Sequence, residues 1–176
     1  MNTARTILMF AVVFAFATAA VPQIPQSQID AADTAGKALA LYYVDPWVGA
    51  WNLNVKKSRF SPGPPLKGGK ALIQPYGNGV KCTLDPVSAD GETRHGEWMA
   101  RYDGKDSPAA MGPYADSVSI RKRGSNTLEA VYKKQGKTIL TEKWTVPRNG
   151  KHLTVIQVEE NPSGQGFLNI LVYEKE

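Results

Sequence analysis

The sequence predicts an all-β protein, an up-and-down antiparallel β-barrel of eight to nine strands formed by residues 47–176. Three observations predict this class. Short runs rich in β-branched and aromatic residues follow one another after Trp51, with no helical pattern between them. Tight turns containing Gly, Asn or Asp separate these runs. Within several runs apolar and polar residues alternate, as in a sheet with one face in water.

The chain begins with a segment that has the layout of a secretory signal peptide. Residues 1–20 combine a basic start at Arg5, a short apolar run and small residues at the end. Such a run is too short for a membrane span and favours cleavage after Ala19 or Ala20. We therefore expect export and a secreted or periplasmic location.

The next segment, residues 21–46, is predicted to be a leader or linker. Its Pro- and Gln-rich first part, up to residue 28, is expected to be flexible. Asp30 is expected to cap a short helix over residues 31–41, which Pro46 would end at the latest.

Nine strands are expected after this linker, near residues 51–55, 70–76, 79–85, 93–102, 116–122, 126–134, 137–146, 151–159 and 167–174. Turns such as Gly77-Asn78-Gly79 supply the positive backbone angles that hairpins require, so strands adjacent in sequence are expected to pair antiparallel. A meander of this length splits into two sheets or closes on itself. Closure removes both sheet edges and leaves an interior able to hold one small ligand.

The composition excludes several classes of function. The net charge of +5 includes no long basic block, so no nucleic-acid partner is expected. Cys82 is the single cysteine, so the chain cannot form an internal disulfide. Cys82 is then either a buried apolar residue or a reactive thiol. The two histidines, His95 and His152, lie on different predicted strands without a metal-binding motif, so neither a metal nor another cofactor is expected. No catalytic motif is visible, and we expect a monomeric protein that is not an enzyme.

Two segments carry a resemblance to the calycin superfamily. Gly49-Ala50-Trp51 resembles the Gly-x-Trp signature of the lipocalins, and the resemblance implies that Trp51 plugs the closed end of a barrel. The final run Leu171-Val172-Tyr173-Glu174 is similar to the last strand of the fatty-acid-binding proteins, as are Asn149-Gly150-Lys151 and Gln135-Gly136-Lys137 before their strands. The pattern from Trp51 to Pro64 resembles that of small exported bacterial proteins with a lipocalin-like barrel.

The sequence departs from the fatty-acid-binding proteins at two places. An extended Pro- and Gly-rich loop over residues 58–69 stands where that family has a pair of lid helices. The family's last strand also carries an Arg-x-Tyr pair that holds a ligand carboxylate, and the matching positions here are Leu171 and Tyr173. The missing arginine disfavours a fatty acid held by its head group.

The candidate binding residues are the aromatic and apolar side chains expected inside the barrel, with one cation: Trp98, Tyr102, Tyr132, Leu140, Trp144, Lys143, Leu171 and Tyr173. The same aromatic residues are also suitable fillers of a packed barrel without a pocket. Alternation places Lys143 on the face opposite to Leu140 and Trp144, and the sequence leaves open which face points inward. Glu97 and Glu142 are interpreted as solvated charges on the outer face, although Glu142 is an alternative contact for a ligand's polar end.

Two functions follow from these expectations. The first is an exported protein that binds a small hydrophobic or amphipathic molecule inside the barrel. The second is a protein-interaction module, an inhibitor or envelope partner, in which the 58–69 loop projects Phe60 for docking and the barrel is packed.

Overall fold

The computed structural model describes residues 25–28, 30, 44–159 and 166–176. The chain divides into two compact units, residues 1–41 and 42–176. In the first unit, residues 26–28 and 30 are helical. The backbone N–H of Gln28 donates to the carbonyl of Pro25 at 2.9 Å, and proline is well tolerated in a first helical turn. Helical structure therefore begins before Asp30, contrary to the prediction of a flexible segment up to residue 28. The predicted signal peptide and the whole of the helix predicted over residues 31–41 lie outside the described residues.

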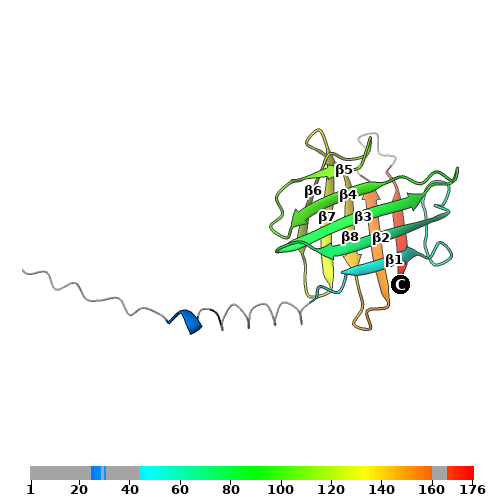
Figure 1. Cartoon of the computed structure of the whole chain (residues 1–176). Helices are drawn as coiled ribbons and strands as arrows, with labels where there is room; N and C mark the ends of the chain where they lie inside the picture. The colour runs from blue at the N-terminus through cyan, green and yellow to red at the C-terminus, as the bar shows by residue number, and fades with distance from the viewer. Residues whose placement is uncertain (1–24, 29, 31–43, 160–165) are drawn as a thin grey trace, which may run out of the picture. The chain divides into compact units, whose positions relative to one another are not determined.

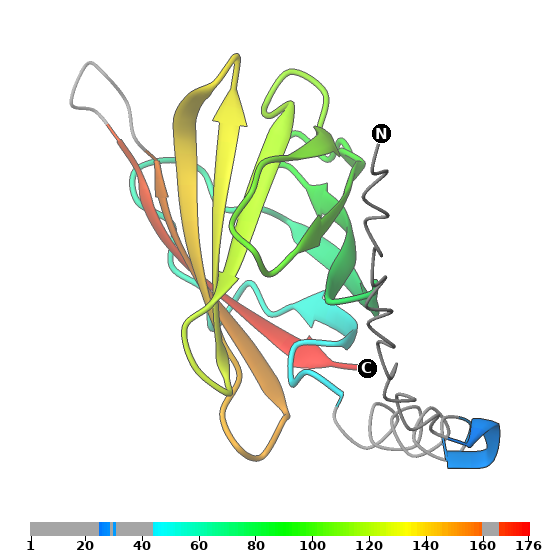
Figure 2. The same cartoon turned by 90° about the vertical axis from the view of Figure 1, so that its left-hand side faces the viewer.

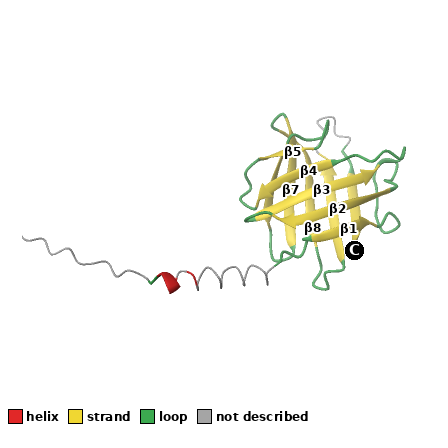
Figure 3. Ribbon diagram, viewed as in Figure 1, coloured by secondary structure: helices red, strands yellow, loops and turns green. Residues whose placement is uncertain are grey.

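The second unit is a closed antiparallel barrel of ten strands (Figure 1). The strands are β1 (Gly49–Leu53), β2 (Gly68–Pro75), β3 (Gly79–Val87), β4 (Gly96–Arg101), β5 (Ser107–Ala110), β6 (Ser117–Lys122), β7 (Thr127–Lys134), β8 (Lys137–Thr145), β9 (His152–Glu159) and β10 (Leu168–Lys175). Neighbours in sequence pair throughout, and β1 closes the barrel against β10, with Trp51 opposite Lys175. Strands β1–β4 cross the direction of β7 and β8 in the view of Figure 1. Apart from the strands, the described residues of the barrel form loops and turns (Figure 3).

The prediction of eight to nine strands is wrong by one, because the sequence pattern does not reveal β5. This strand has only four residues and contains Pro108, which cannot donate a ladder hydrogen bond. It pairs through two residues with β4 and two residues with β6. Closure of the barrel makes so short a strand sufficient, since it bridges two longer neighbours.

The loops alternate between two ends of the barrel because every neighbouring pair of strands is antiparallel. We call one end the mouth; it carries the connections over residues 54–67, 88–95, 111–116 and 135–136 together with Gly166 and Phe167. The other end carries the connections over residues 76–78, 102–106, 123–126 and 146–151, together with the incoming segment 44–48. Figure 2 shows these loops from the side.

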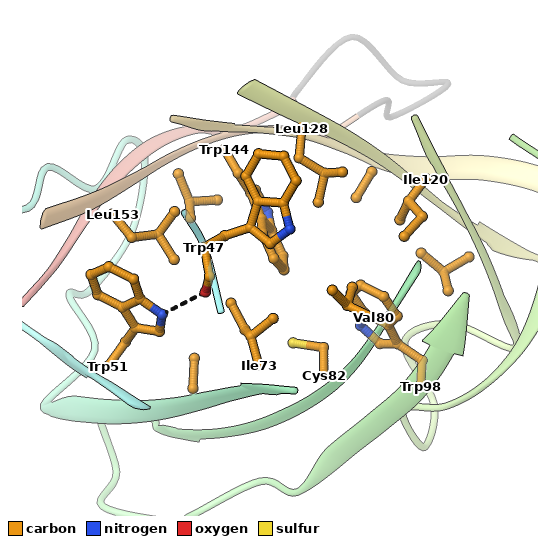
Figure 4. Close-up of a cluster of buried hydrophobic side chains, with 14 of the residues drawn as sticks. Trp47, Trp51, Ile73, Val80, Cys82, Trp98, Ile120, Leu128, Trp144 and Leu153 are labelled. Carbon is orange, nitrogen blue, oxygen red and sulfur yellow. Dashed lines mark hydrogen bonds between the residues drawn. The ribbon is translucent and has the colours of Figure 1, made fainter. Parts of the chain in front are cut away.

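The interior is filled at one end by apolar side chains that come from nearly all of the strands (Figure 4). The expected alternation is present on β4 and on β7, where Leu128, Ala130 and Tyr132 are buried. On β3 it is limited to Val80 and Cys82, since Leu84 is only half-buried. On β8 the inward face carries Glu142, Trp144 and the following Val146. This result decides the orientation that the sequence left open.

Trp47 and Trp51 close the end opposite the mouth. Both are buried, and the indole Nε1 of Trp51 donates to the carbonyl of Trp47 at 2.8 Å (Figure 4). Trp47 also contacts Tyr102 edge to face, with ring centroids 6.0 Å apart. The burial of Trp51 agrees with the plug that the resemblance implied, and Trp47 is a second member of the plug that the sequence did not indicate.

Among the described residues, no helix has the length and apolar character needed to cross a membrane.

Candidate ligand-binding cavity

A cavity of about 330 Å³ lies inside the barrel near the mouth. Its walls come from β2, β3 and β8–β10, and its entrance is formed by the 58–69 loop and the residues before β4 and after β5. Most of the lining is apolar, including Ile73, Leu140, Leu153, Val155 and Leu171. A concave, mostly apolar site of this size fits a small organic molecule, since ligand pockets typically measure about 300 to 1,000 Å³.

One carboxyl group stands inside the barrel at the inner part of this cavity. The Glu142 side chain is only 5% exposed, and it is the single charged residue in the buried core of the described chain. Three donors surround it: the Tyr132 hydroxyl at 3.0 Å and the Trp144 indole Nε1 at 2.7 Å reach Oε2, and the Gln157 amide Nε2 reaches Oε1 at 2.7 Å. A buried polar group of this kind is stable only with such partners.

The Gln157 amide is oriented by a chain of hydrogen bonds that starts at the mouth. The backbone N–H of Ser61 donates to Asn169 Oδ1 at 3.2 Å, and Asn169 Nδ2 donates to Gln157 Oε1, also at 3.2 Å. A backbone N–H can only donate, so both amides have one allowed orientation. Gln157 must therefore present its NH₂ group to Glu142.

The buried setting changes the acidity of the groups around Glu142. Burial raises the pKa of the Glu142 carboxyl, and the hydrogen bonds from Gln157, Trp144 and Tyr132 oppose that rise in part. Burial, together with the charge of Glu142, also raises the pKa of Tyr132 and Tyr173. Both phenols therefore stay protonated at neutral pH.

An aromatic cluster supports this group from the side of the packed core. The Trp98 ring lies 6.3 Å from that of Tyr132 and 6.0 Å from that of Trp144, centroid to centroid. Such edge-to-face and tilted arrangements are favourable ring geometries. The cluster limits the rotamers of Tyr132 and Trp144, the two side chains that donate to Glu142 Oε2.

The predicted binding residues fall into three groups. Leu140, Trp144, Leu171 and Tyr173 line the cavity. Trp98 and Tyr132 are buried behind its wall, where Tyr132 reaches Glu142. Tyr102 and Lys143 lie elsewhere, so the structure does not bring the full predicted set together.

Tyr102 lies at the closed end instead of in the cavity. Its hydroxyl donates to Asp45 at 2.6 Å and accepts from Trp47 Nε1 at 3.0 Å, and Lys122 Nζ lies 4.2 Å from the centre of its ring. Tyr102 is thus part of the plug, because the segment that carries Asp45 and Trp47 folds over this end.

Lys143 points outward, so the prediction that it contributes to the site is wrong. The residue is exposed, while its neighbours Glu142 and Trp144 are buried. The strand has a two-residue period, and burying the Trp144 indole is favourable, whereas burying an unpaired ammonium group is costly.

The 58–69 loop forms part of the cavity wall and does not project Phe60. The backbone of Arg59 pairs with Ile170 of β10, with N–O distances of 2.8 and 2.9 Å, and the N–H of Leu168 donates to the Ser61 carbonyl at 2.7 Å. Phe60 is half-buried, packs against the core and lines the cavity. The expectation of an exposed docking side chain at Phe60 is therefore wrong.

The inward position of Glu142 and the roles of Gln157 and Asn169 differ from what the sequence pattern predicted. Glu142 was interpreted as a solvated charge, yet its alternation with Trp144 and Val146 was the signal that it faces inward. Gln157 and Asn169 had no comparable signal, because single amides on strands are common on outer faces as well. Their roles follow only from the pairing of Asn169 with Gln157 across β9 and β10.

The other polar side chains near the mouth and on the outer face of β2 have partners of their own. His95 Nδ1 lies 2.8 Å from Asp85 Oδ1, and the Arg94 guanidinium lies 5.4 Å from the centre of the Tyr114 ring. Lys70 Nζ lies 3.3 Å from Glu176, with an exposed side chain. The Arg94 and His95 side chains are exposed and lie at the entrance, whereas Lys70 points outward from β2. The described residues contain no cluster of three or more side chains able to hold a metal ion.

No family model matches the chain, and no curated protein matches its sequence. The barrel is similar to the crystal structure of zebrafish ileal bile acid-binding protein complexed with cholic acid, at 10% identity and a TM-score of 0.49, over 74% of this chain and 99% of that chain. The closed antiparallel barrel agrees with the up-and-down barrel that the sequence predicted.

Proposed function

We propose that this protein is an exported binding protein that holds one small hydrophobic or amphipathic molecule inside its barrel. The observation that carries the proposal is the apolar cavity of about 330 Å³ with a single hydrogen-bonded carboxyl group inside it. A barrel that served only as a rigid scaffold would be more stable if side chains filled this space. The apolar wall supplies affinity, at about 0.8 kcal/mol for each methylene removed from water.

Export is supported by the sequence alone. The basic start, short apolar run and small residues of positions 1–20 have the pattern of a cleaved signal. Intact-mass measurement of the protein recovered from a cell that carries its full gene tests this part. A mature chain beginning at Ala20 or Val21 supports export, and a chain that keeps residues 1–20 contradicts it.

The binding role is tested by filling the cavity from one strand. Val155 lines the cavity and is 4% exposed, whereas Val158 on the same strand points outward and is 44% exposed. Val155→Trp is expected to lower the affinity for an uncharged naphthylamine fluorophore at least tenfold, while Val158→Trp leaves it unchanged. Circular dichroism spectra of both variants verify that the barrel is retained.

Two results would contradict the proposal. One is the absence of any bound molecule in native mass spectra of the protein from its source, combined with no saturable binding of the fluorophore. The other is equal affinity of Val155→Trp and the wild type, which would place the fluorophore outside the barrel.

A further inference from the structure

We propose that the ligand's polar end is a hydrogen-bond donor without negative charge, an alcohol or an amine, which binds to Oε1 of Glu142, and that carboxylates are excluded. This inference rests on the proposed function, because it specifies the class of molecule held in the same cavity. It follows from the positions of donors and acceptors around one carboxyl group.

The first step concerns the two oxygens of Glu142, which are not equally occupied. Oε2 accepts from both Tyr132 and Trp144, so its two lone pairs are used. Among the described residues, Oε1 accepts a hydrogen bond only from Gln157. One acceptor position therefore remains on Oε1, and Glu142 is among the residues that line the cavity.

The second step concerns what the neighbouring side chains can offer a ligand. Trp144 Nε1 can only donate, and the Ser61–Asn169–Gln157 chain forces Gln157 to donate as well. Both donate to Glu142, and the Gln157 amide keeps a second N–H that can donate to an uncharged ligand oxygen. A ligand group next to Oε1 must supply its own hydrogen.

The third step concerns charge. The cations of the lining among the described residues are Arg94, which lies at the mouth against the Tyr114 ring, and Lys70, which points out of the barrel to Glu176. No described cation of the lining reaches the inner part of the cavity, so a carboxylate placed there would meet Glu142 without compensation. An ammonium group would instead bring the counter-charge that this buried acid lacks, and a hydroxyl would satisfy its free lone pair.

A competing arrangement places an anionic head at the mouth, close to Arg94 and His95, with the apolar tail inside. The Asp85 carboxylate next to His95 and the open, wet setting of these side chains make that grip weak. The two arrangements predict opposite orders of affinity, so one series of ligands separates them.

The test uses four ligands with the same apolar chain: decanol, decylamine, decanoate and methyl decanoate. Their affinities are measured at neutral pH by displacement of the uncharged naphthylamine fluorophore and by calorimetry. Decanol and decylamine are expected to bind about tenfold or more tightly than methyl decanoate, which has no donor, because a hydrogen bond to a buried carboxyl group is then lost. Decanoate is expected to bind at least tenfold more weakly than decanol.

The variant Glu142→Gln provides the second arm. Its amide nitrogen replaces Oε1, so the group facing the cavity becomes a donor and the preference for alcohol over ester should disappear or reverse. Glu97→Gln, the same substitution on an exposed side chain paired with Lys81, should keep the wild-type order. The wild-type series decides the question even where Glu142→Gln fails to fold.

Each outcome has a defined meaning. Decanoate binding as tightly as decanol, or an unchanged order in a folded Glu142→Gln variant, overturns the inference while the binding role stands. Failure of every ligand and of the fluorophore to bind the wild type overturns the binding role and this inference together.

Discussion

Replacing Glu142 by Gln should destabilise the barrel most at acidic pH, and the effect should shrink as the pH rises. In the protein, Oε1 of Glu142 accepts from Gln157 Nε2 at 2.7 Å. The amide nitrogen of the variant would face that NH₂ group, and Gln157 cannot rotate its amide without losing its bond from Asn169. One buried hydrogen bond is lost, and two donors are left facing each other, at a cost of about 1–3 kcal/mol.

The pH dependence follows from the raised pKa of Glu142. A carboxyl group whose pKa is higher in the folded than in the unfolded protein stabilises the fold below the unfolded pKa, which is about 4.3. That contribution is lost as the pH rises from there through the folded pKa, because the native state must then hold a buried charge. Gln has no such charge. The difference in unfolding free energy between wild type and variant should therefore fall by up to about 1.4 kcal/mol per pH unit within this window.

The other groups around Glu142 do not obscure this slope. Tyr132, Tyr173 and Cys82 face it from β7, β10 and β3, and burial raises the pKa of each, so all three stay neutral over the range. Trp144 and Gln157 do not titrate. The change with pH in this region of the barrel therefore comes from Glu142.

The assay is urea denaturation followed by tryptophan fluorescence at a series of pH values above and below the window. Glu97→Gln serves as the control, because its hydrogen bond and ion pair with Lys81 lower the pKa of Glu97. Any contribution of Glu97 is present above its unfolded pKa and lost as the pH falls, which gives the opposite slope. A free-energy difference for Glu142→Gln that stays constant or grows with rising pH would refute the assignment of Glu142 as an uncompensated buried acid.

Three further predictions concern the frame of the barrel. Trp47→Ala should lower the unfolding free energy by about 3–5 kcal/mol in chemical denaturation, because it removes a buried indole from the closed end. A loss below about 1 kcal/mol would show that this end is not part of the core. Gly79→Ala should prevent or strongly weaken folding, because a Cβ at this position would lie 2.6 Å from the Cα of Arg101 and collide with the Ala100 carbonyl. The measurement is the native circular dichroism spectrum, which should be lost. A variant of wild-type stability would contradict the β3–β4 register. The Cys82 thiol is fully buried, and that burial raises its pKa. It should therefore react with an aromatic disulfide reagent only after the protein unfolds. Rapid labelling of the native protein would contradict its buried position.

Local sequence patterns were sufficient to predict most of the strands. A two-residue alternation such as Leu128, Ala130 and Tyr132 assigns one face to the core, and a turn such as Gly77-Asn78-Gly79 sets the pairing of its two neighbours. These are short-range signals, and the structure agrees with them. The strand β5 has neither signal, because four residues with a proline do not establish an alternation.

The sequence by itself determined an all-β meander with its apolar rows, because side-chain periodicity and turn chemistry act between residues close together in the chain. Only the tertiary structure decided that β8 turns Glu142 inward and Lys143 outward, that Tyr102 joins Trp47 at the closed end, and that Ser61 orients Gln157 through Asn169. Each of these depends on partners brought together from distant strands. The burial of a polar group is decided by the sum of its contacts in the closed barrel, and no local stretch of sequence contains that sum.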